Sequence, residues 1–528
     1  MTARATFARV VTALALLAIA ACGVIDLGSH GGDPGPDGGG SGVLVPIDEA
    51  GSSDDAGLDA DVQTDAKPAA VVYVKASNTQ PGAEFADVAI DGDTLVVGAP
   101  KEGSGASGID GDQTDRSAPL AGAVYVFRRS AGVWAQEAYI KASNAAENAV
   151  FGACIALQGN TLVVGAFQES STGTDAGAAY VFTRTGTTWS EQAILRASNA
   201  RSGAFFGNAV ALSGDEVVIG APGDASNATG VNGNANDTSK PDAGAAYIFK
   251  RTGTAWSQTA FLKASNTRAD AAFGTTLALQ NDTLVVGALR ESSNATGVNG
   301  NQNDTSIKTA GAGAGAAYVF TRSAGAWSQQ AYLKSSNRFP IPDLGGGFSL
   351  ALALSGHTLA VGQYIEPSNA TGVGGNQTNT SAANSGAVYV FTRIGTTWSQ
   401  QAYLKASNTR ASALFGFTLA LEANTLIVGA RGESSDAVGW DGNQSDTSQS
   451  GAGAAYTFAR AGSTWAQTHY LKATNTRAQT AFGYSVSLSG GTFVIGSAYE
   501  GSAATGVDGD GGPDANAAPS SGAVYVFP

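Results

Sequence analysis

The sequence predicts an all-β fold: a seven-bladed β-propeller of four-stranded antiparallel blades, closed by an N-terminal outer strand in the last blade. Three observations predict it. A β-branched run such as "TLVVGAP" occurs seven times, and an aromatic run such as "GAVYVF" also occurs seven times. A run that begins with tryptophan, as in "WSQQAYLK", occurs only six times. Four short β-type runs per unit, repeated every 55–71 residues, are typical of propeller blades.

Each of the four runs has the features of a strand. The first, as in "FGNAVALSG" at 206–214, opens with phenylalanine and alternates large apolar and small residues up to a glycine turn. The second, "TLVVGA", is a continuous apolar run, as expected of a strand buried on both faces. The third, "GAVYVF", is rich in aromatic and β-branched residues. The fourth follows glycine turns such as "RTGTTW". A stacked β-solenoid would need shorter units, and separate sandwiches would need longer ones.

The unequal counts of the runs predict how the ring closes. The last unit stops at Pro528 after its third run, without a tryptophan segment. The first recognisable run, "VVYVKASN" at 71–78, matches only the end of a fourth run. We therefore expect residues 71–76 to pair with residues 522–527 and to supply the missing outer strand of the last blade.

Composition restricts the partners of the chain. The 528 residues are 43% hydrophobic, enough to bury a large core, and only 14% charged. The formal net charge is −14, so the protein has no electrostatic basis for binding nucleic acid. Cations and basic surfaces are the partners that such a charge favours.

Residues 1–21 are predicted to be a lipoprotein signal peptide. Arg4 and Arg9 precede the apolar run "VVTALALLAIAA", which is too short to remain as a membrane span. The run ends at "IAAC", which resembles the lipobox of bacterial lipoproteins, and this resemblance implies that Cys22 carries the lipid. A soluble secreted protein with an ordinary cleavage site is the alternative.

Residues 22–68 are predicted to be a disordered acidic tether rich in glycine and aspartate. From residue 23 onward they hold ten acids and one lysine, too little apolar surface to offset the entropy of ordering. The propeller is then expected at residues 69–528, outside the cytoplasm and attached to a membrane only through the lipid. Gly23 replaces the aspartate associated with inner-membrane retention, so lipoprotein sorting favours, by analogy, the outer membrane or cell surface of a Gram-negative bacterium.

The phenylalanine–glycine opening, "VVGAP" and "GAVYVF" together resemble the FG-GAP repeat, the blade unit of integrin α-subunit propellers and of many bacterial surface proteins. The resemblance covers residues 71–528 and implies a seven-bladed extracytoplasmic propeller used mainly for binding. In integrin-type repeats, calcium occupies an Asp-rich loop between the first and second strands. Here that connection is a tight turn such as "LSGDE", so the integrin calcium sites are not transferred to this chain.

An insertion of a different kind lies between the second and third runs of every unit except the second. It reads, for example, "ASGIDGDQTDRS" at 106–117 and "AVGWDGNQSDTS" at 437–448. Its oxygen-bearing side chains, at spacings of two and five residues, suit a calcium ion that takes six to eight oxygen ligands. The alternative is a loop of Asx-turns, because several copies carry uncharged asparagine instead. The candidate ligands are Asp110, Asp112, Asp115, Asp441, Asn443, Asp446, Asp508 and Asp510.

A second pattern recurs without exception: an acid stands four residues after the glycine of each second run. The seven members of this acidic ring are Glu102, Glu169, Asp224, Glu291, Glu366, Glu433 and Glu500. Each fourth run ends in a base, with an asparagine three residues later, and antiparallel topology brings all of these to one face. A feature identical in every blade serves the fold more readily than a single ligand. We therefore interpret the ring as structural, pairing with bases or capping backbone amides to hold the blades in register.

The sequence contains little that predicts catalysis. Three histidines are scattered, and the inner strands are nearly identical and mostly uncharged, whereas propeller hydrolases place unlike carboxylates around the channel. We expect a monomeric binding module that engages a protein or a glycan through the face with the insertions, with calcium as the only cofactor suggested. The alternatives are a structural envelope protein without a small ligand and a hydrolase that uses the channel.

Overall fold

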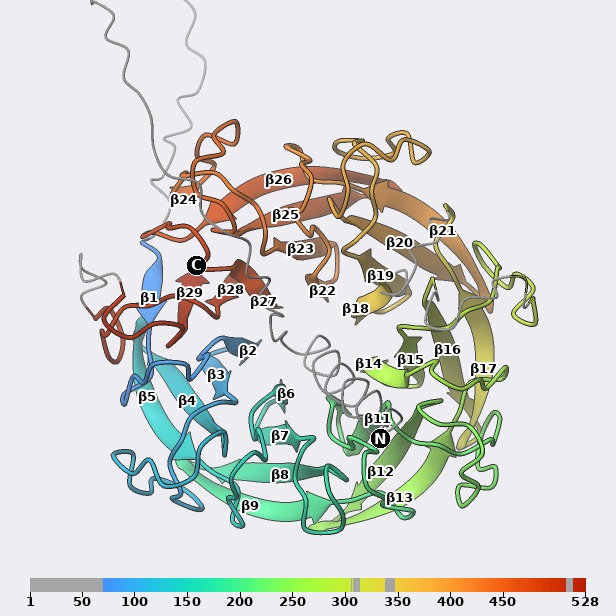
Figure 1. The fold of residues 1–528 in the computed structure, drawn as a ribbon, viewed down its shortest axis with the longest axis horizontal. Helices are drawn as coiled ribbons and strands as arrows, with labels where there is room; N and C mark the ends of the chain where they lie inside the picture. The colour runs from blue at the N-terminus through green and yellow to red at the C-terminus, as the bar shows by residue number, and fades with distance from the viewer. Residues whose placement is uncertain (1–69, 305, 307–313, 338–346, 510–515) are drawn as a thin grey trace, which may run out of the picture.

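The computed structural model describes residues 70–304, 306, 314–337, 347–509 and 516–528, and all regular elements in these ranges are β-strands. Seven sheets form a closed ring around a central axis (Figure 1), which confirms the predicted all-β, seven-bladed propeller. Within the same ranges, no helix has both the length and the apolar character needed to cross a membrane.

The four main strands of each blade follow the chain from the centre of the ring outward, except in the last blade, and blade 6 adds a short strand outside its fourth. Blades 1 to 3 comprise β2 (Asp87–Asp91), β3 (Thr94–Ala99), β4 (Ala123–Ser130), β5 (Val133–Ile140); β6 (Cys154–Gln158), β7 (Thr161–Ala166), β8 (Ala178–Thr185), β9 (Thr188–Leu195); β10 (Ala209–Ser213), β11 (Glu216–Ala221), β12 (Ala245–Thr252) and β13 (Ala255–Leu262). Blades 4 to 6 comprise β14 (Phe273–Gln280), β15 (Thr283–Ala288), β16 (Ala316–Ser323), β17 (Ala326–Leu333); β18 (Phe348–Ser355), β19 (Thr358–Gln363), β20 (Ala387–Ile394), β21 (Thr397–Leu404); β22 (Thr418–Glu422), β23 (Thr425–Ala430), β25 (Ala454–Ala461), β26 (Thr464–Lys472) and the short β24 (Gly439–Trp440).

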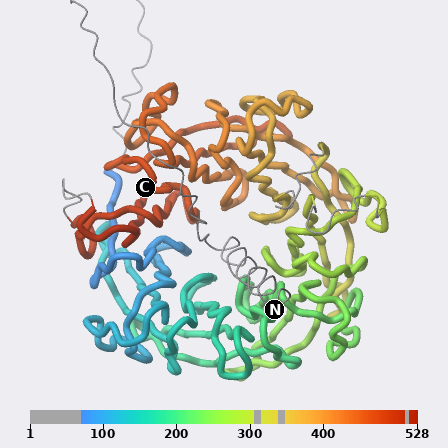
Figure 2. The backbone as a smooth tube through the Cα atoms, viewed as in Figure 1, coloured from blue at the N-terminus to red at the C-terminus, as the bar shows by residue number. Residues whose placement is uncertain are grey.

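The last blade combines both ends of the propeller. It comprises β27 (Phe482–Ser489), β28 (Thr492–Ser497), β29 (Ala523–Phe527) and β1 (Val72–Val74), in the order β1-β29-β28-β27. Tyr73 is paired with Tyr525 in antiparallel register, so the predicted closing strand is confirmed. Figure 2 shows the blue start of the described chain beside the red C-terminal segment.

The phenylalanine that opens each unit anchors the core of its blade. All seven phenylalanines are fully buried, and each packs against the tyrosine and the phenylalanine of the third strand in its own blade. In blade 1 the ring of Phe85 lies edge-on to Tyr125, with 5.2 Å between the ring centroids. This geometry adds a favourable quadrupolar contact to the burial of two large apolar side chains.

Two glycines per repeat let neighbouring blades approach at backbone distance. A Cβ on the glycine before the third strand would collide with the backbone of the next blade's opening phenylalanine, as at Gly122 with Phe151 and at Gly522 with Phe85. A Cβ on the glycine of the second strand, such as Gly98, would collide with the carbonyl oxygen of Gly152 in the next blade. The Phe85 N–H also donates to the Ser521 carbonyl at 2.9 Å, so the last blade contacts the first through the same backbone contact. The glycines of the repeat motif are therefore the residues that the contact between blades requires.

Replacing Gly522 by Ala should open the ring between blades 7 and 1. Gly132 is the matched control, because its φ of 83° is within one degree of the 82° of Gly522 while a Cβ there would meet nothing within 4 Å. Gly132→Ala should cost only the left-handed strain of about 1–2 kcal/mol. Gly522→Ala should lower the free energy of unfolding by at least about 3 kcal/mol, measured by urea denaturation. Equal losses in the two variants would show that the close approach is unimportant.

Candidate functional site

The acidic ring is buried rather than displayed. Each acid lies just beyond the second strand of its blade, and the exposed fraction of all seven is 3% or less. Each carboxylate forms an ion pair with the base at the end of the outermost strand in its own blade. These pairs are Glu102–Lys141 at 2.8 Å, Glu169–Arg196 at 3.2 Å, Asp224–Lys263 at 3.1 Å, Glu291–Lys334 at 2.8 Å, Glu366–Lys405 at 2.9 Å, Glu433–Lys472 at 2.9 Å and Glu500–Lys75 at 2.8 Å.

An asparagine joins each ion pair to the preceding blade. Asn337 follows the outermost strand of blade 4, and its Nδ2 donates a hydrogen bond to the carboxylate of Glu366 in blade 5 at 3.0 Å. The asparagine's oxygen in turn accepts a hydrogen bond from a buried third-strand tyrosine, here Tyr389. The same acid–asparagine bond occurs at all seven boundaries, and the other six link Asn78–Glu102, Asn144–Glu169, Asn199–Asp224, Asn266–Glu291, Asn408–Glu433 and Asn475–Glu500.

The charges of the acidic ring are paired with cations within the protein. Burial lowers the pKa of the Lys405 ammonium, and the negative charge of Glu366 opposes that shift. The Ser368 N–H and the Lys405 Nζ both donate to the Glu366 carboxylate, so its oxygens have partners without any ligand. The Glu366 carboxylate in this state offers no open position to a partner molecule.

Removing one charge of this network should be far more harmful than removing both. Lys405→Met leaves the Glu366 carboxylate buried without its cation, and we expect a loss of about 3–5 kcal/mol in the free energy of unfolding. Adding Glu366→Gln should restore much of the loss, which a double-mutant cycle in urea would measure.

Arg196→Met is the matched comparison, because the Arg196 side chain is 27% exposed and water can replace its contact with Glu169. Its cost should be clearly smaller. Additive effects of the Lys405 and Glu366 substitutions would contradict a coupled buried pair.

The insertion loops cover the outer edge of their blades. In blade 1 the Asp110 N–H donates to the Tyr139 carbonyl at 2.8 Å, and the Asp110 carboxylate accepts the Tyr139 N–H at 2.9 Å. Asp110 adopts a left-handed φ of 54°, which aspartate, asparagine and glycine tolerate best. That requirement explains why the other five loops place one of these three residues there: Asn232, Asn299, Gly374, Asp441 and Asp508.

The remaining acidic and amide side chains of the loops fold back on their own backbone. The Asp112 Oδ1 accepts the N–H of Thr114, and the Asp115 carboxylate accepts the N–H groups of Ser117 and Gly105. Asn443 and Asp446 make the matching bonds with Ser445 and Ser448. These contacts are Asx-turns, in which the side chain replaces a backbone acceptor.

This geometry does not fit a calcium ion at the candidate ligands. Asp110 binds the outermost strand, whereas Asp112 and Asp115 bind separate loop amides, so their oxygens serve different partners. Across the described ranges, no three His, Cys, Asp or Glu side chains gather as a metal site. Asp510 and the lipidation candidate Cys22 lie outside the described residues.

The loop of blade 6 differs most from the others. It forms the two-residue strand β24 beside β26, at the outer circumference of the ring (Figure 1). Its Trp440 lies edge-on to the His469 ring, with 5.0 Å between centroids, and against Phe527 of blade 7 at 5.3 Å. The neighbouring Val438 is 55% exposed.

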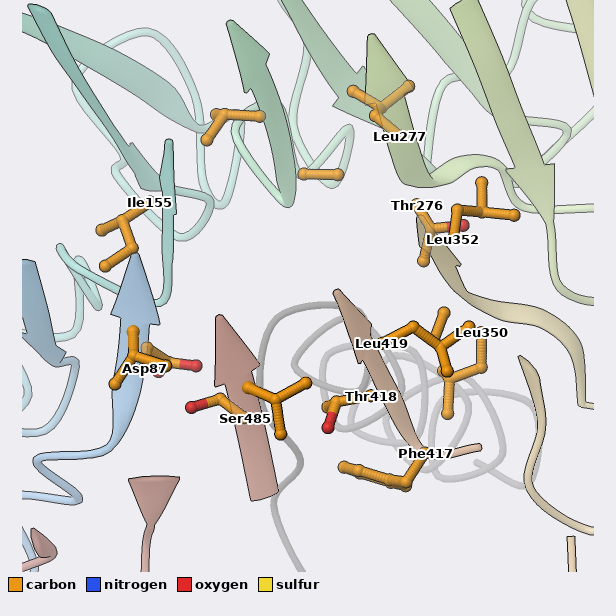
Figure 3. A pocket seen from close by; sticks show the side chains of 15 residues that line it. Asp87, Ile155, Thr276, Leu277, Leu350, Leu352, Phe417, Thr418, Leu419 and Ser485 are labelled. Atoms are coloured by element: carbon orange, nitrogen blue, oxygen red, sulfur yellow. The ribbon is translucent and has the colours of Figure 1, made fainter. Parts of the chain in front are cut away.

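A cavity of about 230 Å³ occupies the central channel, where the innermost strands of all seven blades meet (Figure 3). One position per blade supplies a branched aliphatic side chain to its wall. The seven members of this aliphatic ring are Val88, Ile155, Val210, Leu277, Leu352, Leu419 and Val486. Such a wall favours an apolar occupant.

A single carboxyl breaks this apolar wall. Asp87 lines the cavity, and Figure 3 shows its carboxyl pointing into the open space. Asp87 is only 4% exposed, and its Oδ1 atom has no hydrogen-bond partner. Burial raises the pKa of Asp87 well above its usual range, and the nearby charge of Glu84 raises it further. The Glu84 carboxylate itself is held by Lys101 at 2.6 Å.

Asp87 is the functional candidate that sequence reasoning missed. The register of the innermost strands places small or hydroxyl-bearing residues at the same position of the other blades: Cys154, Ala209, Thr276, Ala351, Thr418 and Ser485. The signal was present in "FADVAID" of the first unit, where the aspartate departs from the other copies. The innermost strands are mostly uncharged, as expected, and Asp87 is the one charged residue of theirs that lines the cavity.

Replacing Asp87 by Thr, the residue of blades 4 and 6, should stabilise the protein at neutral pH. Since folding raises the pKa of Asp87 above the ordinary value of about 3.9, the parent loses stability as the pH rises from about 4 through the raised value. The threonine variant lacks that loss, so its advantage in unfolding free energy should be small at pH 4.5 and larger at pH 7.5. Urea unfolding at both pH values measures it.

The neighbouring titratable groups Glu84, Lys101 and Tyr484 are present in both proteins, so their own titrations largely cancel in the difference. An advantage that is the same at both pH values would show that ionisation of Asp87 is not its cause.

Comparisons with known proteins agree with the repeat structure. A family model described as the FG-GAP repeat matches five segments that together cover more than half of the chain: residues 134–182, 189–249, 256–320, 398–458 and 465–527. No curated protein sequence matches the chain. A solved structure titled "Crystal Structure of Mitotic Checkpoint Complex" is similar at 10% identity and a TM-score of 0.40, over 89% of this chain and 96% of that one. The chain belongs to the FG-GAP repeat family.

Proposed function

We propose that this propeller is a binding module presented outside the cytoplasm, and that it engages a protein or a glycan through its loop face, the face that carries the six insertions. The fold itself is compatible with a binding or interaction module. The observation that supports this choice of face is the division between buried and exposed residues. The repeated acids, bases and asparagines take part in contacts between strands and blades, and the acids are buried, whereas the loops expose side chains.

One exposed position in each loop has no structural task in the hydrogen-bond pattern. It follows the first alanine of the loop and holds hydroxyl residues in five blades and Val438 in blade 6. The loop backbone beneath it is fixed by the left-handed residue and the Asx-turns. A rigid loop with an exposed side chain loses little entropy on binding, which favours recognition.

The lipid anchor belongs to the same proposal. A lipid on Cys22 and the acidic tether of residues 22–68 would hold the propeller at the surface of the outer membrane while leaving its faces accessible. Removal of residues 1–21 would take away Arg4 and Arg9 and make the formal charge of −14 more negative. Basic surfaces on a protein partner would then be favoured.

Two other functions remain as alternatives with distinct consequences. A structural envelope protein would show no partner that depends on the loop residues. A hydrolase that uses the channel would need a second carboxylate near Asp87 as an acid–base partner, and Glu84, the nearest acid, is engaged by Lys101.

Five lysine substitutions on the loop face should abolish ligand capture without unfolding the propeller. The positions are Thr229, Thr296, Thr371, Val438 and Thr505, all exposed. The purified full chain, immobilised, would be tested against an array of purified glycans and against envelope proteins, with bound protein identified by mass spectrometry. We expect at least a tenfold loss of the captured ligand, because five new cations alter the surface potential as well as its shape.

The matched control places five lysines in the turns between the third and fourth strands, or at the first residue after the turn in the case of Val133, on the opposite face of the blades. These positions are Val133, Thr187, Thr254, Thr396 and Ser463, which are also exposed. The control has the same net charge and should keep the ligand. Equal loss in both variants, or a parent chain without any reproducible ligand, would contradict recognition by the loop face.

A further inference from the structure

The central channel combines an apolar wall with one unsatisfied carboxyl. The aliphatic ring surrounds the cavity, and Asp87 is the charged member of the neighbouring ring of small and hydroxyl-bearing side chains. A buried polar group without a hydrogen-bond partner costs free energy, and a buried carboxylate without a cation costs more. The other blades show that the fold accepts alanine or threonine at this position. Asp87 therefore has no role in the fold that these residues could not fill.

The described part of the chain supplies no countercharge for Asp87. The two influences on its pKa are burial and the negative charge of Glu84, and both favour the uncharged acid. Lys101, the cation beside them, is engaged by Glu84 at 2.6 Å. A cation that enters the cavity would thus meet the Asp87 carboxyl, the one carboxyl among the described residues that line it.

Hydroxyl oxygens stand at the same level of the channel. The hydroxyls of Thr276 and Thr418 donate to backbone carbonyls of the next blade, at 2.6 and 3.1 Å, and the Ser485 hydroxyl donates to the Ala86 carbonyl. Their lone pairs are left as acceptors. An ammonium group has three donors, so a carboxylate and hydroxyl oxygens together match its chemistry.

Size and shape restrict the rest of the ligand. A cavity of about 150 Å³ lined by aliphatic side chains holds benzene, so the 230 Å³ of this channel accommodates a somewhat larger apolar body. The residue after the Asp87 position in each innermost strand contributes to the aliphatic ring, which suits a carbon chain rather than a sugar. The formal charge of −14 also favours the approach of a cation over that of an anion.

We propose that the central channel binds a small primary aliphatic ammonium ion, with its nitrogen paired to Asp87 and its carbon chain against the aliphatic ring. This site is separate from the loop face, and the two can be present or absent independently. The ligand restores a partner to Asp87 and covers the apolar wall at the same time. The ion pair with Asp87 selects a cation, and the aliphatic ring selects an apolar carbon chain. Together the two contacts select an aliphatic ammonium ion.

The test uses n-hexylammonium chloride as the probe and n-hexanol as its uncharged counterpart, titrated calorimetrically into the purified full chain at pH 7.5. We expect saturable binding of hexylammonium at a single site and at least tenfold weaker binding of hexanol. Asp87→Asn keeps the shape of the side chain but removes its charge, and it should weaken hexylammonium at least tenfold while changing hexanol little. Urea denaturation would verify that the variant is folded.

Glu147→Gln is the charge control, because Glu147 is exposed and lies outside the channel wall. It removes the same unit of net charge and should leave the hexylammonium affinity unchanged. Equal weakening by the two substitutions would indicate a general electrostatic effect and would overturn the proposal. So would an absence of hexylammonium binding, equal affinities for hexylammonium and hexanol, or binding of calcium chloride in place of the amine.

Discussion

The close backbone approach between blades is the constraint on which the rest of this structure depends. The glycine before each third strand and the glycine inside each second strand leave space for the main chain of the next blade, and a single methyl group at either would collide with it. Because the contact is between backbones, it is independent of the other side chains and can be repeated seven times with one geometry. The ring closes because Gly522 meets Phe85 in the same way that Gly122 meets Phe151.

That geometry also explains the buried ion pairs. Once two blades lie this close, the acid beyond the second strand is covered by the asparagine of the preceding blade and cannot remain hydrated. A buried carboxylate needs a cation and full hydrogen bonding, and the base at the end of the outermost strand supplies the cation. The strand that closes the ring is bound by the same rule, because Lys75 pairs with Glu500 of the last blade and Asn78 reaches Glu102 of the first. Closure of the ring therefore depends on polar contacts of the closing segment with both the last and the first blade, as well as on the pairing of β1 with β29.

Much of this could be predicted from the sequence, because strand number and order depend on local patterns that repeat. The missing fourth run and the isolated "VVYVKASN" were enough to predict that residues 71–76 pair with residues 522–527, and the observed ladder pairs Val72–Val74 with Val524–Val526. The common face of the acids and bases could also be predicted, because antiparallel topology determines on which face the strand ends lie. Their burial could not be predicted, because topology does not determine which side chains cover those strand ends. Other loops carry asparagine or glycine at the position of Asp110, and only the left-handed φ seen in the structure explains this choice of residues. Asp87 was missed because a comparison of units emphasises what they share.

The same comparison, inverted, locates function in a repeat protein. A residue that occurs in all seven blades serves a structural requirement of every blade. Those requirements here are close approach of the backbones, paired charges and a covered outer edge. A single ligand on the axis needs a specific contact only once, and one blade can provide it. Asp87 meets these conditions: it is unique in its ring, it lies at the axis, and it lacks the partners that the fold supplies to every acid of the repeated network. An uncompensated buried carboxylate costs stability, and a bound cation would offset that cost, whereas the small or hydroxyl-bearing residues that the other six blades carry impose no such cost.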